Sequence, residues 1–269
     1  MSRRTRSRPP VAVAILAAVA VVFFAVPVVG LLQRAPWSEI VDDLRDPVVR
    51  DALRLSLVCS IGATALAFVL GLPLAWVLAR TELPGRRFVR ALVLLPMVLP
   101  PVVGGVALLL AFGRRGLVGQ YLDDWFGVRL PFTTWGAILA EAFVAMPFFV
   151  IVVEAGIRSL DRRYEEAAAT LGARGFTTFR RVVLPLIAPS LVAGAALTWA
   201  RALGEFGATI LFAGNLQGKT QTMPLAIFVE LQTNLGGAIA LSLVLLSISI
   251  VVLVSLRDRW FGGLRDAGR

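Results

Sequence analysis

The sequence contains no histidine and a single cysteine among its 269 residues. Zinc sites built on histidine and Ser-His-Asp triads are therefore excluded. Cys59 lies within an apolar run, so a disulfide framework or a cysteine metal site is excluded too, and we expect Cys59 to be a small core residue. No convincing cluster of catalytic groups remains. The sequence thus argues against a membrane-embedded enzyme, and we expect no catalytic residue and no metal site.

Charged residues are also scarce, at 16% of the chain, whereas 58% of the residues are hydrophobic and the mean hydropathy is +0.81. Soluble domains are far less apolar. A helix needs ~20 mostly apolar residues to cross a bilayer, and six runs have about that length. We expect an all-α membrane protein with six transmembrane helices in a single domain, 1–269, at approximately 11–32, 55–79, 88–112, 135–157, 186–213 and 239–256.

The first apolar run follows the basic segment "MSRRTRSRPP", an arrangement that also occurs in secretory signal peptides. The run is about 22 residues long, whereas the apolar region of a signal peptide has ~7–15, and no A-x-A cleavage site ends it. We therefore keep it as the first transmembrane helix.

The basic residues are distributed unevenly between the two sides of the membrane. If the first helix starts inside, 18 of the 27 Lys and Arg lie in the cytoplasmic segments 1–10, 80–90, 158–185 and 257–269, and 8 lie outside. Because cytoplasmic loops carry the excess of basic residues, we expect both termini in the cytoplasm. The net charge of +10 is then explained by topology and attraction to anionic membrane lipid, and we expect no binding of nucleic acid.

The longest cytoplasmic loop, 158–185, has the composition of two short helices joined by a turn. "DRRYEEAAATLG" has acidic residues early, three alanines and a terminal glycine, and "FTTFRRVVL" can form the second helix. The spacing E-A-A-x3-G-x9-V-x-L-P resembles the signature of the permeases of ATP-binding-cassette (ABC) importers, with Val182 in place of the usual isoleucine. The residues that carry the resemblance are Glu166, Ala167, Ala168, Gly172, Leu184 and Pro185.

That resemblance implies a type I ABC importer permease fold, in which this loop docks on a cytoplasmic ATPase and couples it to transport. An alanine-rich helix that ends in a glycine with positive φ suits a stiff, sharply turned joint. We expect these six residues to couple the chain to the ATPase. For Glu166 two interpretations stay open: pairing with charges of the docking groove, or support of the helix N-terminus.

ATP is expected on another subunit. The segment "GNLQGKT", 214–220, is one residue short of the phosphate-loop pattern, follows no strand and falls in an outer loop. We therefore expect no cofactor in this chain and ATP with Mg²⁺ on the partner ATPase, which makes this chain a non-catalytic pathway subunit. One coupling loop per chain cannot engage both motor subunits, so the resemblance also implies a homodimer.

The segment from Ala202 to Asn234, "ALGEFGATILFAGNLQGKTQTMPLAIFVELQTN", is similar to the molybdate-importer permeases and more loosely to those for sulfate and tungstate. The resemblance implies import of a tetrahedral oxyanion delivered by an extracytoplasmic binding protein, across the plasma (inner) membrane of a bacterium or archaeon. Molybdate is the expected cargo, with tungstate and sulfate as alternatives. A gradient-driven secondary transporter is the alternative of a different class; the coupling loop and the lack of an inverted repeat argue against it.

Ionisable residues within the expected spans are candidates for function, because burying a charge in a membrane is costly. Arg201 and Glu205 are four residues apart and so share a helix face. Either Arg201 attracts the passing oxyanion while Glu205 restrains it, or the two form a static ion pair that positions the helix. The neighbouring residues Gly204, Phe206 and Gly207 would either form a gate with Phe206 as an apolar plug or merely pack helices.

Other features of the spans are less informative. We expect Glu154 to reach toward water at the inner end of its helix, and we assign no role to Glu141. In "LLPMVLPPVVGG" the prolines Pro96, Pro100 and Pro101 should bend the third span, and Gly104 and Gly105 should allow close packing. A gate and a simple kink explain this pattern equally well.

Overall fold

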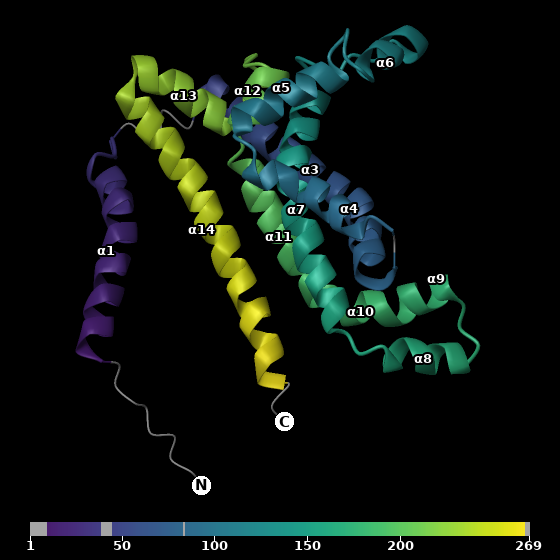
Figure 1. Ribbon diagram of the computed structural model, residues 1–269. Helices are drawn as coiled ribbons and strands as arrows, with labels where there is room; N and C mark the ends of the chain where they lie inside the picture. The colour runs from purple at the N-terminus through teal and green to yellow at the C-terminus, as the bar shows by residue number, and fades with distance from the viewer. Residues whose placement is uncertain (1–9, 39–44, 83, 267–269) are drawn as a thin grey trace.

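A computed structural model describes residues 10–38, 45–82 and 84–266 (Figure 1). The ordered elements in these ranges are all helical. Four helices are long and apolar enough to cross a membrane. They are α1 (Val11–Gln33), α3 (Pro47–Arg80), α7 (Thr134–Ser159) and α14 (Leu235–Asp266), the last with its apolar part at Leu235–Val252. Residues 1–9 of the expected basic segment 1–10 lie outside the described residues, and so do residues 267–269 of the segment 257–269.

The core forms where α3, α7 and α11 (Ala188–Leu203) pack together. Small residues let these helices approach closely, because a Cβ added at Gly71 or Gly194 would lie 3.0–3.3 Å from the ring of Phe149. One buried cluster, near the end of α7 that leads into the coupling loop, joins all three helices to the loop itself. Its members include Leu78, Phe149, Val153, Ile157, Val183 and Leu191.

The third expected span, 88–112, is not a single helix. It consists of α4 (Arg86–Val98) and α5 (Pro101–Phe112), whose axes differ by 119°. Two successive prolines, Pro100 and Pro101, offer no backbone N–H to continue the α4 ladder, and Leu99 and Pro100 are extended, with ψ of 135° and 133°. The expectation of one bent helix is therefore wrong, and the prolines break the span.

The fifth expected span, 186–213, is also interrupted. Its main part, α11, begins after a bend of 72° at Ile187 and ends at Leu203. Residues 204–206 are non-helical, and a second helix, α12 (Gly207–Phe212), follows them. The expectation of a continuous helix over these residues is wrong, and the break falls at the candidate residues Gly204, Glu205 and Phe206.

Two further helices lie in segments that were expected to be loops, namely α6 (Gly119–Phe126) and α13 (Met223–Thr233). In Figure 1 these helices, together with α5 and α12, gather at the upper end of the molecule. The start of α1, the end of α14 and the segment around α8 and α9 lie at the opposite end. The molecule therefore has two distinct ends, with the coupling segment at one and the two broken spans reaching the other.

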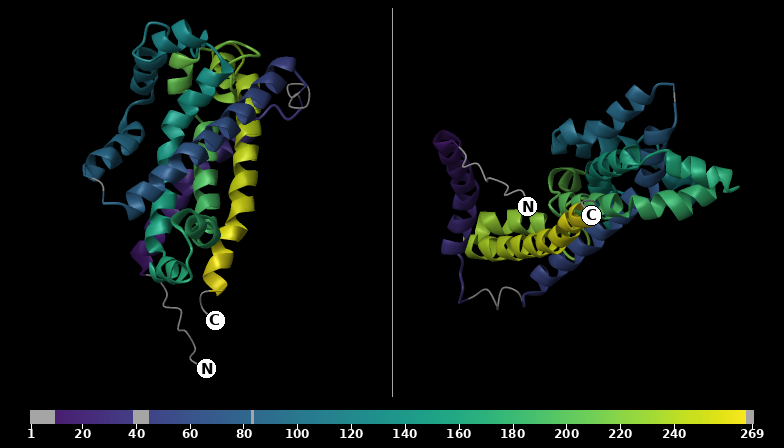
Figure 2. Two further views of the ribbon diagram at one scale, coloured as in Figure 1. Left: turned by 90° about the vertical axis from the view of Figure 1, so that its right-hand side faces the viewer. Right: turned by 90° about the horizontal axis from the view of Figure 1, so that it is seen from below.

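Helix α1 stands apart from the rest. None of its residues is buried, and its few contacts are with α14. Seen from below, α1 and the coupling segment lie on opposite sides of the bundle (Figure 2). An apolar helix without a covering neighbour in its own chain must be covered by lipid or by another protein chain.

Candidate functional site

The coupling segment is built from four short helical pieces that form an exposed knuckle beside the bundle (Figure 1). They are α8 (Arg163–Thr170), α9 (Gly175–Thr178), the π-helical turn η1 (Phe179–Val183) and α10 (Leu184–Leu186). The sequence expectation of a helix, a turn and a second helix describes this arrangement, with the second helix divided into three pieces.

The turn of the knuckle is a Schellman motif, in which a left-handed residue ends a helix and two backbone hydrogen bonds cover its last carbonyls. Gly172 has φ of 78°. The N–H of Gly172 donates to the carbonyl of Ala169 (2.9 Å), and that of Ala173 donates to Ala168 (3.0 Å). Gly172 therefore occupies the conformation that glycine adopts at low cost and that side-chain-bearing residues resist.

The six motif residues have different surroundings. Glu166 and Ala167 are exposed, while Ala168 is buried on the inner face of α8. The carboxylate of Glu166 lies in the first turn of α8, where it also complements the helix dipole. Leu184 packs against the buried core cluster, and Pro185 is exposed near the start of α10. Leu184 therefore anchors the segment, whereas Glu166 and Ala167 are available to a partner.

Three large apolar side chains of the coupling segment are exposed. The exposed fractions of Tyr164, Leu171 and Phe176 are 54%, 88% and 75%. Tyr164 lies at the start of α8, whereas Leu171 and Phe176 lie on either side of the turn at Gly172, so large apolar side chains are exposed along the segment.

The part of the coupling segment nearest the bundle is held against the end of α3. Arg80, the last residue of α3, forms an ion pair with Glu165 of α8 (2.7 Å) and donates a hydrogen bond to the carbonyl of Leu160 (3.0 Å). The rings of Trp76 and Phe179 meet edge to face, 5.0 Å apart. The coupling segment is therefore tied directly to α3 by an ion pair, a hydrogen bond and a ring contact. Sequence reasoning missed Arg80 and Glu165, because nothing in the sequence indicates which of the many arginines reaches this carboxylate.

The second candidate region lies at the break between α11 and α12. Glu205 is only 1% exposed, and its Oε2 is 2.6 Å from a guanidinium nitrogen of Arg201. Its Oε1 accepts a hydrogen bond from the backbone N–H of Ala208 (2.9 Å). Glu205 therefore pairs with Arg201 across the end of α11 and caps the first turn of α12 at the same time. The geometry contains the static ion pair of the sequence analysis, with the cap as an unexpected addition.

The residues around Glu205 hold the break in place by close packing. A Cβ added at Gly207 would come within 2.6 Å of the Cβ of Pro101, and one added at Gly105 would come within 2.8 Å of Leu211. The ring of Phe206 packs on Phe228 of α13, with centroids 5.1 Å apart. Gly204, in contrast, is exposed and open. Thus α12 lies tightly against α5, and the expectation of close packing holds at Gly105.

Glu141 is a second buried carboxylate near this break. It lies on α7, is 1% exposed and is within electrostatic range of Glu205. Within the described part of the chain, no donor forms a hydrogen bond with its Oε2. Two acidic side chains and one arginine therefore share the interior at the level of the α11–α12 break.

Glu154 does not reach toward water as the sequence suggested. It is 7% exposed and forms ion pairs with Arg90 of α4 and with Arg158 of its own helix, the latter at 2.7 Å. Its charge is compensated by neighbours, which is the usual way to bury a carboxylate.

The phosphate-loop-like segment 214–220 is a structural turn between α12 and α13. Gly214 and Gly218 have φ of 75° and 70°, and the hydroxyl of Thr220 accepts a hydrogen bond from the N–H of Leu216 (2.9 Å). Its glycines are thus explained by the turn.

The helices are arranged as in solved ABC transporters. The chain superimposes on the alginate ABC transporter in complex with an alginate-bound periplasmic protein with a TM-score of 0.71, 20% identity, and 93% and 92% of the two chains covered. For the MetNI methionine ABC transporter the TM-score is 0.60 at 19% identity, with 78% and 94% covered. These likenesses show a shared fold.

Residues 53–262 match the family described as binding-protein-dependent transport system inner membrane component, and the chain belongs to this family. It is therefore a transport permease of the plasma membrane. The molybdenum transport system permease protein ModB of Mycobacterium bovis is 45% identical to it over 89% of this chain and 90% of that protein. ModB of Escherichia coli is 40% identical (81% and 96% covered), and the sulfate permease CysT of Salmonella typhimurium is 40% identical (84% and 81% covered).

Proposed function

We propose that this chain is the membrane-spanning, non-catalytic permease subunit of an ATP-driven molybdate importer. The observation that carries the proposal is the exposed, rigid knuckle closed by Gly172, on a chain 45% identical to a molybdenum permease over most of its length. Sulfate is the second candidate cargo, because a sulfate permease is 40% identical. Tungstate shares the tetrahedral shape and the charge of both anions.

The proposed membrane topology has six spans, with α4–α5 and α11–α12 each counted as one broken span. Both termini and the coupling segment then face the cytoplasm, as the excess of basic residues at that end supports. The opposite end, with α6, α13 and the 214–220 turn, faces the binding protein. Two copies form the pathway, and the uncovered α1 gives each copy an apolar surface for lipid or for its partner.

In the proposed mechanism the motor is a pair of separate ATPase subunits, which hold ATP and Mg²⁺. The exposed side chains of Tyr164, Leu171 and Phe176 dock on the ATPase, together with Glu166 and Ala167. Closure of the ATPase pair draws the two knuckles together. The Arg80–Glu165 ion pair and the Trp76–Phe179 contact pass this movement to α3, so that the pathway opens outward and returns after hydrolysis.

At the α11–α12 break, the pair Arg201–Glu205 sets the position of α12 against α5. Arg201 is 30% exposed while Glu205 is buried, so the accessible partner carries the positive charge. In the proposed pathway Arg201 offers weak attraction to a passing oxyanion, and Gly204, Phe206 and Gly207 form the gate, with Phe206 as its apolar plug. Binding must remain weak here, since a transported ion has to leave again.

Uptake by the reconstituted complex tests the function. Proteoliposomes containing the permease, its ATPase and its binding protein receive radiolabelled molybdate, with tungstate or sulfate as unlabelled competitors. We expect accumulation that requires ATP and is suppressed by tungstate more than by sulfate. Stronger uptake of radiolabelled sulfate would assign the chain to that cargo instead. Uptake driven by an ion gradient without ATP would overturn the ABC mechanism.

Cysteine labelling tests the orientation. Arg162→Cys, at the coupling segment, and Gln217→Cys, in the 214–220 turn, are made separately in a Cys59→Ala background. We expect an impermeant thiol reagent to label Gln217→Cys in intact cells and Arg162→Cys only in inverted vesicles. Labelling of Arg162→Cys from outside would reverse the topology and remove the basis for coupling.

A further inference from the structure

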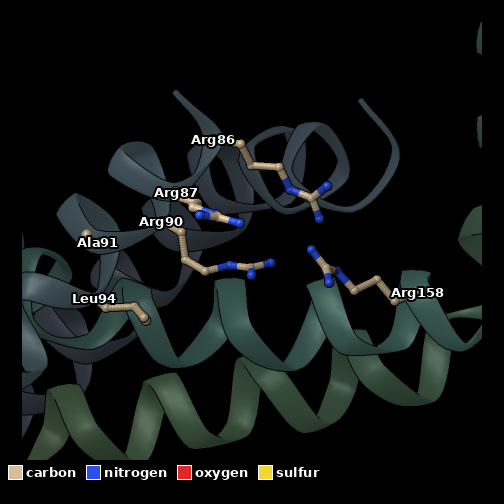
Figure 3. Close-up of a pocket in the computed structure, with 6 residues that line it drawn as sticks. All are labelled: Arg86, Arg87, Arg90, Ala91, Leu94 and Arg158. Carbon is tan, nitrogen blue, oxygen red and sulfur yellow. The ribbon is translucent and has the colours of Figure 1, made fainter. Parts of the chain in front are cut away.

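A basic cavity lies between the start of α4 and the end of α7, beside the coupling segment. Its volume is about 400 Å³, in the range of small-molecule sites. The guanidinium groups of three arginines on α4 and one on α7 converge on the space between the two helices (Figure 3). The residues that line it are Arg86, Arg87, Arg90, Ala91, Leu94 and Arg158.

The charges in this cavity are only partly compensated. Glu154 pairs with both Arg90 and Arg158, so one carboxylate faces four guanidinium groups. No ion pair among the described residues involves Arg86 or Arg87. A cluster of like charges on facing helices is unfavourable unless an anion joins it. Arginine also binds phosphate oxygens in a bidentate geometry, which suits a tetrahedral oxyanion.

A second, apolar cavity of about 310 Å³ adjoins the basic one and shares Arg90, Leu94 and Arg158 with it. Its other walls are mostly aliphatic side chains of α4 and α7, among them Val93, Val150 and Ile151. The combined space therefore has a cationic mouth at the end of the helices and an apolar slot that leads along them. A free inorganic anion would occupy only the cationic mouth, whereas a phospholipid would fill both the mouth and the apolar slot.

We propose that the two cavities form a binding site for an anionic phospholipid, with its phosphate held by Arg86, Arg87, Arg90 and Arg158 and an acyl chain in the slot between α4 and α7. In the topology proposed above, this end faces the cytoplasmic leaflet, where basic pockets between helices recognise acidic headgroups. The lipid would lie beside Arg158, whose hydrogen bond to the carbonyl of Leu78 joins the end of α7 to α3. Because the ligand is part of the membrane, the site concerns regulation or assembly of the permease, separately from its cargo.

Lipid retention by the purified full chain tests this proposal. The probe is dioleoyl phosphatidylglycerol, titrated in detergent, with dioleoyl phosphatidylcholine as the neutral comparison and native mass spectrometry as the readout. We expect the wild type to retain phosphatidylglycerol preferentially. In Arg86→Gln/Arg87→Gln the retention should fall about thirtyfold, since each arginine near the headgroup contributes about 1 kcal/mol and 1.4 kcal/mol corresponds to tenfold. These two arginines are chosen because their removal leaves the Glu154 ion pairs intact.

Two matched variants complete the test. Arg163→Gln removes a charge at the same end of the molecule from a side chain that is 89% exposed and does not line the cavity, so it should leave retention unchanged. Ile151→Trp fills the apolar slot while keeping all four arginines, so it should lower retention of the dioleoyl lipid. Equal loss in Arg163→Gln and the double variant, no loss in Ile151→Trp, or equal retention of the two lipids would each overturn the proposal. Displacement of the lipid by millimolar molybdate or phosphate would assign the cavity to a free oxyanion and overturn the lipid as its occupant.

Discussion

The break between α11 and α12 and the turn between α8 and α9 both end a helix, and they are held in opposite ways. At the break, side chains fix the geometry: buried Glu205 pairs with Arg201 and caps Ala208, and Gly207 touches Pro101. At the turn, the backbone alone fixes it. A Cβ added to Gly172 would meet nothing within 4 Å, although its φ is 78°.

This difference teaches where each region is vulnerable. The break has desolvated charges, so losing one partner leaves the other exposed to a low-dielectric interior. The turn has exposed neighbours and few contacts, so a substitution there affects the fold only through the local conformation. We therefore expect changes at the break to alter folding and abundance, and changes at the turn to alter transport in a protein that still folds.

The largest effect should come from Glu205→Ala. The substitution leaves Arg201 without its carboxylate, removes the cap from Ala208 and opens a cavity at the buried position of Glu205. We expect the free energy of unfolding to fall by about 3 kcal/mol. This value is at the low end for broken buried ion pairs because Arg201 is partly exposed. Thermal unfolding in detergent and abundance in membranes measure it.

Glu205→Gln is the matched control for that prediction. The amide oxygen still accepts from Ala208 and fills the same volume, while the charge is lost. We expect about half the destabilisation of the alanine variant. If the two variants are equally stable, the ion pair alone accounts for the loss, and packing and capping at the break contribute little.

A smaller effect is expected from Arg201→Ala, since only the ion pair is lost and Glu205 keeps its hydrogen bond from the N–H of Ala208. We expect Arg201→Ala to lower the free energy of unfolding by about 1–2 kcal/mol. The double variant Arg201→Ala/Glu205→Ala should lose less than the sum of the two single losses. Abundance and uptake of all four members of this cycle are measured together. Loss of uptake at wild-type abundance in Arg201→Ala, without recovery in the double variant, would instead assign Arg201 to the anion pathway.

The sequence predicted the helical membrane fold and the coupling segment because both leave strong local patterns. Apolar runs of ~20 residues indicate crossings, and the spacing from Glu166 to Pro185 is specific. The breaks at Pro100 and at Gly204 were harder, because prolines and glycines bend some helices and interrupt others. Which outcome occurs depends on what packs alongside, here α5 against α12.

Partners that are distant in the sequence could not be predicted at all. Glu154 pairs with Arg90 on another helix, and Glu165 with Arg80. Each pairing depends on the register in which two helices meet, and a single sequence does not encode that register in any local pattern. The hydrogen bond from the N–H of Ala208 to Glu205 was not predicted for a related reason. Residues 204–206 were expected to be helical, and a helix interior has no cap.

The sharpest effect on function, with a strain confined to the turn, should come from Gly172→Val. A β-branched residue resists positive φ, so the Schellman turn is strained by about 1–2 kcal/mol and its direction shifts. Because Gly172 is surrounded by solvent, we expect near-normal insertion and abundance. In the reconstituted complex, substrate-stimulated ATP hydrolysis should continue while fewer anions are transported per ATP.

Gly175→Val is the matched control: Gly175 is three residues away, equally open, and has no positive φ. It should transport normally, because a helical position accepts valine. Normal coupling in Gly172→Val would show that the shape of the turn does not transmit motion. Equal uncoupling in both variants would mean that added bulk on the knuckle, rather than backbone conformation, disturbs its contact with the ATPase.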